Sequence, residues 1–306
     1  MASAAILKQI SSAFPDLGEA LKKPLTDSKA QKAVFGVLDI LLNARAGNRE
    51  IRAVATRWSA FSDESGNSKQ ALEVFERLGQ VDPTWTQAEQ ARCRLLLHLN
   101  RPTHALRLID SSKNPKNLQS LRGLCLIKSN PKEAEKLLET SGDYVNLAAL
   151  VESTGGDSKE LWDRAVKERP NSLAALNGAK KFDETLKKEW NENEGSQVEF
   201  NARVAQALTG LGSRARDELF AVTAEGLFRS SISSLEKSIA TSKKPVHSLE
   251  LARTLEEYAK LLKKWEKREP EAEKLQGRAK EIRETTSSFL PSYAFDLPGW
   301  AIEDVD

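Results

Sequence analysis

The side chains best suited to chemistry in this sequence are three histidines and two cysteines. His98 and His104 flank a short turn and are too far apart in register to ligate one ion from a single helix face, and His247 shows no metal-ligand spacing. Cys93 and Cys125 lie in the apolar runs CRLLLHL and GLCLI, which predicts two small buried core residues instead of a disulfide framework. The sequence therefore predicts neither a metal site nor a cofactor.

The sequence patterns of the common enzyme sites are also missing. The chain contains no HExxH, no CxxC, no phosphate-cradling glycine loop and no nucleophile elbow. Gly210 and Gly212, in LTGLGSRARDE, follow a helical pattern and not a strand, which predicts a turn and not a nucleotide site. Acid pairs are numerous because the chain has 44 Asp and Glu residues, but none stands in a context that would desolvate it. We therefore expect a protein that is not an enzyme.

The spacing of small and large apolar residues indicates paired helices. Ala71 is followed four residues later by Phe75, and Ala105 is followed four residues later by Ile109. The two alanines lie 34 residues apart, which is the period of a two-helix repeat, and Pro83 ends the first of the two helices. A small residue lets the partner helix approach, and the large residue one turn later fills the gap beside it.

This pattern resembles the tetratricopeptide repeat family, whose units place small, large and proline residues at these positions. The clearest unit runs from about residue 52 to residue 85, and the resemblance weakens along the chain. In the third unit Ala134 follows Ala105 after only 29 residues, so its helices or its turn must be shorter. The residues that the resemblance assigns to repeat packing are Trp58, Ala71, Phe75, Pro83, Cys93, Ala105, Ile109, Gly123, Ala134, Leu138 and Trp162.

Helical patterns continue to the carboxyl-terminal part, where residues 257–282 look like the longer repeats of kinesin light chains. We expect an all-α fold of stacked helical hairpins, a tetratricopeptide-like α-solenoid with longer carboxyl-terminal helices. The expected regions are amino-terminal helices that could form a cap (1–48), helical repeats (49–190), a second helical region (198–287) and a tail (288–306). The expected helices are 29–46, 49–61, 68–78, 86–99, 103–111, 117–128, 131–140, 144–152, 158–167, 172–182, 198–211, 214–240, 248–267 and 270–287.

Charge is abundant and almost balanced, with a formal net of +2, so it gives no global indication of nucleic-acid binding. Lysines 260–267 and Arg268 alternate with glutamates, which predicts a solvated helix face. An RNA-associated helical-repeat protein remains the alternative, and it would need one surface to collect Arg49, Arg52, Arg57, Arg92, Arg94, Arg101 and Arg107.

The tail, residues 288–306, combines aromatic and acidic side chains with two prolines that prevent a continuous helix. Its aromatic residues could cover an exposed groove on the last helices, or anchor the tail on another protein. The final residues, IEDVD, are similar to the IEEVD-type endings of heat-shock chaperones, which implies a link to co-chaperones as a further alternative. The anchor candidates in the tail are Phe289, Tyr293, Phe295, Trp300 and Asp306.

Taken together, these patterns predict a non-catalytic protein-binding adaptor or assembly subunit that uses a helical-repeat groove. Arg52, Gln90 and Asn117 are the candidate groove residues, although they match a standard carboxylate clamp only in part. No stretch approaches the roughly 20 apolar residues of a membrane span, and the first 25 residues make a poor secretory signal. We expect protein partners, which the sequence does not identify, and a cytoplasmic location.

Overall fold

The structure is a computed structural model, and it describes residues 29, 36, 38, 52, 55, 68–81, 85–189, 197–242, 244–265 and 267–286. Over these ranges the regular structure is helical and no strand occurs, which confirms the predicted all-α class. The predictions for the amino-terminal cap, for Trp58 and Pro83, and for the tail 288–306 lie outside the described residues.

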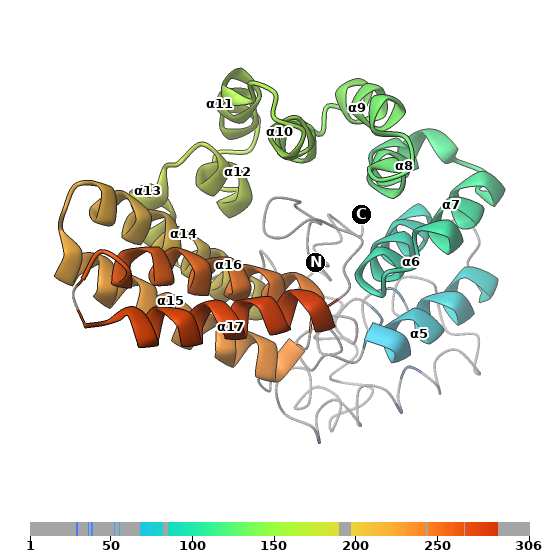
Figure 1. Ribbon diagram of the computed structural model, residues 1–306. Coiled ribbons are helices and arrows are strands. Elements are labelled where there is room, and N and C mark those ends of the chain that lie inside the picture. The colour runs from blue at the N-terminus through green and yellow to red at the C-terminus, as the bar shows by residue number, and fades with distance from the viewer. Residues whose placement is uncertain are drawn as a thin grey trace.

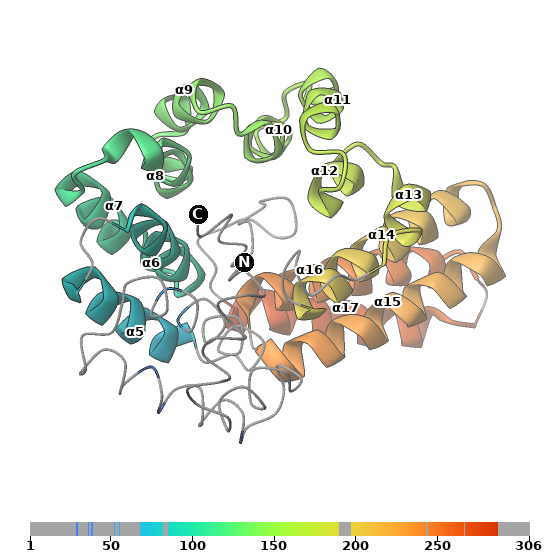
Figure 2. The same ribbon diagram turned by 180° about the vertical axis from the view of Figure 1, so that it is seen from behind.

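The first part of the described chain is a curved row of short helices, which we call the arc. Helices that follow one another in the chain pack against each other, and the row bends round as Figures 1 and 2 show from opposite sides. Its members are α5 (Ser68–Val81), α6 (Thr86–His98), α7 (Pro102–Ser111), η1 (Pro115–Leu118), α8 (Gln119–Leu126), α9 (Pro131–Thr140), α10 (Tyr144–Ser153), α11 (Lys159–Glu168), α12 (Leu173–Gly178) and α13 (Phe182–Leu186).

Local signals in the sequence explain why these helices are short. Proline occupies the first turn of α7 and α9, where its missing N–H group leaves no hydrogen bond unmade. Asn130 caps α9 by accepting a hydrogen bond from the Glu133 amide at 3.4 Å, and Ser172 caps α12 by accepting one from the Ala175 amide at 3.2 Å. The predicted helix 131–140 therefore has the bounds that the structure shows.

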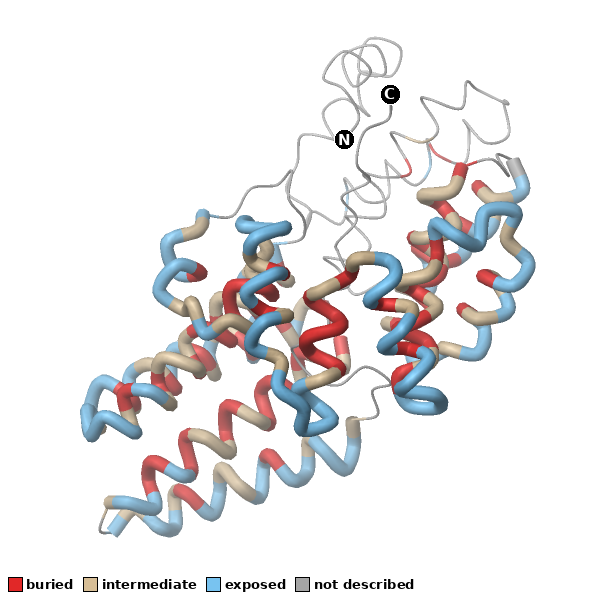
Figure 3. The backbone as a smooth tube through the Cα atoms, turned by 90° about the horizontal axis from the view of Figure 1, so that it is seen from above, coloured by how far each residue is buried: buried red, intermediate tan, exposed pale blue. Residues whose placement is uncertain are grey.

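The second part is an antiparallel bundle of four longer helices, which we call the bundle. It consists of α14 (Gln197–Asp217), α15 (Ala221–Ser242), α16 (Pro245–Leu262) and α17 (Glu269–Thr285). Helix α16 packs against α14, α15 and α17, and buried residues line the facing sides of the helices in Figure 3. The turns α14–α15 and α16–α17 lie at the same end of the bundle (Figure 1), and α13 packs on α14 close to this end, where Arg214 Nη2 lies 3.0 Å from Asp183 Oδ2.

The predicted turn at Gly210 and Gly212 is wrong, because both glycines lie inside α14, which continues to Asp217. A Cβ atom on Gly210 would lie 2.2 Å from the Phe182 ring, and one on Gly212 would lie 3.0 Å from the Phe228 ring. The glycines therefore give two aromatic rings access to the bare helix backbone. This packing compensates the roughly 1 kcal/mol by which glycine disfavours a helix interior.

Two other predicted helices end earlier than the sequence indicates. The predicted helix 172–182 ends at Gly178, because Lys180 adopts a positive φ of 59° that a helix cannot contain, and a further helix, α13, begins at Phe182. The predicted helix 248–267 ends at Leu262, and Lys267 also has a positive φ, of 68°. The lysine-rich stretch therefore lies at a helix end and in a turn, and only in part on a helix face.

Candidate interaction surfaces

The described residues that were assigned to repeat packing all lie on buried sides of the arc helices. Gly123 shows what they do, because a Cβ atom there would lie 3.0 Å from Leu138 Cγ and 3.2 Å from the Ala134 carbonyl oxygen. Glycine thus allows α8 and α9 to approach closely. The other members of this set within the described residues are also buried: Ala71, Phe75, Cys93, Ala105, Ile109 and Trp162.

Trp162 packs the last helices of the arc together, next to the contact with the bundle. Its indole Nε1 donates a hydrogen bond to Glu152 Oε2 at 3.1 Å, and its ring covers Gly178, where a Cβ atom would lie 2.4 Å from the ring. A buried amide continues the connection, because Asn177 Nδ2 donates to Gln206 Oε1 at 3.0 Å and to the Arg203 carbonyl at 2.9 Å. The end of the arc is therefore fixed to α14 by specific contacts.

Of the candidate groove residues, the structure brings two together. Gln90 Nε2 of α6 donates a hydrogen bond to the Asn117 carbonyl oxygen at 3.2 Å, across the junction between α6 and η1. Arg52 contacts the residue that precedes α6. Its guanidinium carbon lies 5.5 Å from the centre of the Trp85 ring, which is a cation–π contact. The five anchor candidates of the tail lie outside the described residues.

The middle of the arc does not form an open groove. Six consecutive residues of α10, Val145–Leu150, are buried, and at about 100° per residue they cover the full circumference of the helix. In α12 the four residues Ala174–Asn177 are buried in the same way. These two helices therefore offer little accessible side-chain surface in the middle of the arc.

The arginines of the RNA alternative do not share one exposed surface within the described part of the chain. Arg101 and Arg107 are exposed, whereas Arg92 and Arg94 are half-buried and keep their Nε atoms away from water. Arg52 lies on the Trp85 ring. Among the described members of this set, only Arg101 and Arg107 are fully exposed to a phosphate backbone, and Arg49 and Arg57 lie outside the described residues.

The two thiols lie in the apolar core of the arc. Burial raises the pKa of Cys93 and of Cys125 to about 12, so both stay protonated at neutral pH. Within the described ranges, no group of three or more His, Cys, Asp or Glu side chains is placed to hold a metal ion. The same ranges hold no helix that is both long and apolar enough to cross a membrane.

One buried cluster joins α14 to the turn before α16. Lys244 Nζ lies 2.7 Å from Glu199 Oε1, His247 Nε2 lies 3.3 Å from Glu199 Oε2, and His247 Nδ1 lies 3.0 Å from Ser242 Oγ. Burial alone would raise the pKa of Glu199, but the Lys244 ammonium and His247 hold it well below its usual range. The order of groups is that of an acid–histidine–serine relay.

The geometry of this cluster indicates a structural role. Ser242 is buried, and its hydroxyl donates to the Ser238 carbonyl oxygen at 3.0 Å. A substrate would need access to that hydroxyl, which the surrounding helices cover. The cluster fixes the turn between α15 and α16 against α14. Single-sequence reasoning missed it, because Glu199 and Lys244 are 45 residues apart and nothing in the sequence shows that their helices are neighbours.

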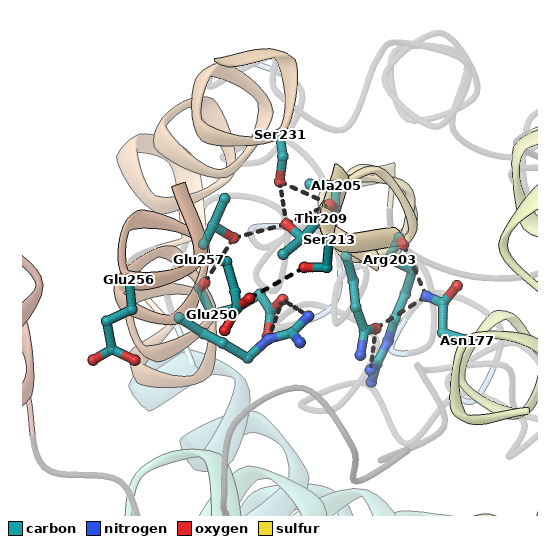
Figure 4. A network of polar contacts seen from close by, with 12 residues as sticks. Asn177, Arg203, Ala205, Thr209, Ser213, Ser231, Glu250, Glu256 and Glu257 are labelled. Carbon is teal, nitrogen blue, oxygen red and sulfur yellow. Dashed lines mark hydrogen bonds and ion pairs between the residues drawn. The ribbon is translucent and has the colours of Figure 1, made fainter. Parts of the chain in front are cut away.

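A second polar network lies inside the bundle (Figure 4). Thr209 Oγ1 lies 2.8 Å from both Ser231 Oγ and Thr254 Oγ1, and thus links α14, α15 and α16. Ser231 also donates to the Ala205 carbonyl, and Thr254 to the Glu250 carbonyl. Each hydroxyl therefore has a partner, so the network fixes the register of three helices without leaving a buried polar group unsatisfied.

Comparison with known proteins gives one partial similarity. The chain is similar to the transcription factor HBP-1b(c38) of Triticum aestivum, with 32% identity over 120 residues. The matched part spans 38% of this chain and 34% of that protein. The similarity therefore covers only about a third of the length of each protein. No protein-family model matches the chain.

Proposed function

We propose that this protein is a non-catalytic, cytoplasmic protein-binding scaffold whose arc is a tetratricopeptide-like α-solenoid. The observation that carries the proposal is the continuous core of the arc, a single cluster of buried residues that extends through consecutive helices as far as Ala175 in α12. Each hairpin shares its core with the next, which is how repeat arrays stabilise helices that cannot bury their apolar sides alone. Arrays of this kind provide extended surfaces for protein partners.

The proposed binding surface is the junction of α6 and η1, where Gln90 and Asn117 lie, together with Arg52 on the Trp85 ring at the start of α6. Its chemistry is a guanidinium group beside an aromatic ring and two side-chain amides, which suits an extended peptide with acidic and hydrogen-bonding groups. The contact between Gln90 and Asn117 holds α6 and η1 in a defined relation. A partner would therefore meet a preformed surface, which lowers the entropic cost of binding.

The test is affinity purification with the full chain, followed by binding measurements with the purified partner. The variant Arg52→Ala/Gln90→Ala/Asn117→Ala is compared with a control variant, Thr103→Ala/His104→Ala/Arg107→Ala. The three control residues are exposed on α7. We expect the first variant to lose at least about tenfold in affinity, near 1.4 kcal/mol, and the second to bind as the unchanged protein does. Equal affinities, or turnover of a substrate by the purified chain, would contradict the proposal.

The partial similarity to HBP-1b(c38) favours a second candidate, a scaffold that works with proteins of transcription. This candidate predicts a nuclear location, whereas the first predicts a cytoplasmic one. Imaging of the full chain carrying a fluorescent tag separates them.

The RNA-associated alternative predicts that nucleic-acid affinity falls steeply with added salt. The partial burial of Arg92 and Arg94 argues against it. The co-chaperone alternative depends on the terminal residues up to Asp306, outside the described part, and predicts that a peptide ending in EEVD displaces the tail.

A further inference from the structure

The end of the bundle formed by its two turns carries an unusual apolar surface. Leu219 and Phe220, in the turn between α14 and α15, are 82% and 61% exposed, and Val222, in the first turn of α15, is 82% exposed. Large apolar side chains that are this close together and this accessible are uncommon in proteins that work alone, because each leaves apolar area in contact with water. We call this surface, with the lysines of the neighbouring turn, the bundle tip.

The backbone holds these side chains in place. Leu219 has a positive φ of 66°, a conformation that usually selects glycine and costs a leucine about 1 kcal/mol or more. The turn is closed by hydrogen bonds from the Leu219 amide to the Arg216 carbonyl at 3.2 Å and from the Phe220 amide to the Ala215 carbonyl at 2.8 Å. A glycine would adopt this turn conformation at lower cost. The presence of leucine therefore indicates that its exposed side chain has a role.

The second turn places positive charge beside the apolar side chains. Lys263, Lys264 and Lys267 are exposed in the turn between α16 and α17. Two ion pairs bind this end together, Arg268 Nη1 to Glu225 Oε2 at 2.9 Å and Arg216 Nη1 to Glu257 Oε2 at 2.6 Å.

The electrostatics show that the two turns act on each other. The hydrogen bond from Arg216 is the main cause of the low pKa of Asp217, and Lys264 and Lys260 lower it further. Exposed acids at this end are Asp217, Glu218 and Glu269. Lys263, Lys264 and Lys267 thus offer three exposed ammonium groups at this end, beside the exposed acids Glu218 and Glu269.

The chain contains a segment whose chemistry complements this surface. Residues 288–306 carry four aromatic side chains, four acidic ones and no Lys, Arg or His. The segment follows α17, which begins at the bundle tip and ends at Thr285, about 25 Å away at 1.5 Å per residue. The 20 residues after Thr286 span up to about 66 Å when extended, which is more than enough to return to the tip.

We propose that the bundle tip is the docking surface for the chain's own segment 288–306, with the aromatic side chains on Leu219, Phe220 and Val222 and the acidic groups near Lys263, Lys264 and Lys267. The aromatic side chains of the segment would cover the exposed apolar side chains and remove them from water. Ion pairs between the acidic groups and the lysines would orient the segment on the tip. This proposal does not depend on the function proposed for the arc.

Hydrogen exchange of the full chain, read by mass spectrometry, tests the docking in both directions. The tip variant is Leu219→Ser/Phe220→Ser/Val222→Ser, and the tail variant is Phe295→Ser/Trp300→Ser. If the two surfaces bind each other, the tip variant raises exchange in residues 288–306, and the tail variant raises exchange in residues 216–224, each at least about tenfold. The matched control is Leu186→Ser, another partly exposed leucine, at 38%, and it should leave both regions unchanged.

Three results would overturn the proposal. The first is equal exchange of residues 288–306 in the tip variant and in the unchanged chain. The second is protection of the tip that increases with protein concentration, because the occupant would then be the tail of a second copy. The third is protection that appears only with vesicles containing anionic lipid, because the tip would then bind a membrane surface. Circular dichroism of each variant shows whether the helices are intact.

Discussion

The arc and the bundle are both helical, but they are stabilised by different kinds of core. The arc uses short helices around one continuous cluster of mainly alanine and leucine side chains, with contacts between neighbours in the chain. The bundle uses helices of up to 22 residues, two smaller apolar clusters, and hydroxyl groups that bond to one another across three helices. The comparison shows that nearest-neighbour packing suffices for a row of hairpins, whereas long helices that can slide need polar contacts to fix their register.

The largest effect should come from removing a fully buried phenylalanine in each region. Phe75→Ala in the arc and Phe228→Ala in the bundle should each lower the free energy of unfolding by about 3–5 kcal/mol, because each leaves a cavity. Hydrogen exchange should rise in α5 and α6 for the first variant and throughout α14–α17 for the second. The same exchange pattern for both variants would show that the two regions unfold as one unit.

The second effect concerns an ion pair at the bundle tip. Hydrogen bonds from Arg268 and then Tyr258 lower the pKa of Glu225 from 4.5 to about 2. Because the pKa of the folded protein is below that of the unfolded chain, the carboxylate stabilises the fold above about pH 4.5, and this contribution is lost as the pH falls toward 2. Glu225→Gln should therefore cost about 2–3 kcal/mol at neutral pH and progressively less in acid.

Thermal unfolding of both proteins between pH 7 and pH 3 measures this difference. Glu133→Gln in the arc is the matched control, because Glu133 is exposed and lies in the first turn of α9. Its effect should stay within about 0.5 kcal/mol. A cost for Glu225→Gln that does not change with pH would disprove the assigned ion pair.

Two glycine substitutions should have opposite signs. Gly178→Ala brings a Cβ atom to 2.4 Å from the buried Trp162 ring, so the arc should lose about 1–3 kcal/mol. Gly226→Ala in α15 meets nothing within 4 Å and should gain about 0.5–1 kcal/mol, because alanine favours a helix. Urea unfolding of the two variants checks the signs. Stabilisation by Gly178→Ala would contradict the tight contact at Trp162.

The smallest effect is expected in the hydroxyl network. Thr209→Val removes one hydroxyl and should cost about 1 kcal/mol, because Ser231 and Thr254 keep their backbone acceptors. The triple variant Thr209→Val/Ser231→Ala/Thr254→Val should cost less than the sum of the three single changes, because the contacts that two hydroxyls share are lost in more than one of the single variants. Urea unfolding of the single and triple variants measures this coupling. Simple additivity would show that the three groups do not form a network.

The sequence predicts the arc better than the bundle, and particular residues show why. Helix α9 has its predicted bounds because Pro131 and Asn130 are local signals at its start. Gly210 and Gly212 lead to the wrong prediction of a turn. They allow close contact with Phe182 and Phe228, and a single sequence does not show which rings pack on a helix. The cluster of Glu199 and Lys244 depends in the same way on how distant helices pack.

The candidate surfaces are predictable only in part for a related reason. Gln90 and Asn117 follow from the repeat pattern, and the structure brings them together. The buried circumference of α10 does not follow from that pattern, since its apolar sequence YVNLAALVES suits any well-packed helix. The exposed Leu219 and Phe220 read as ordinary apolar positions within an expected longer helix. Their exposure becomes visible only when the turn is placed at Glu218.

Three aromatic rings pack on three glycines: Trp162 on Gly178 within the arc, Phe182 on Gly210 between the arc and the bundle, and Phe228 on Gly212 within the bundle. Each ring occupies the volume that a methyl group would need. Among species that carry this protein, ring and glycine should therefore vary as linked pairs, and an alanine at one of these positions should accompany a smaller side chain opposite it. An alignment of many such sequences would test this linkage as covariation between the ring position and the glycine position.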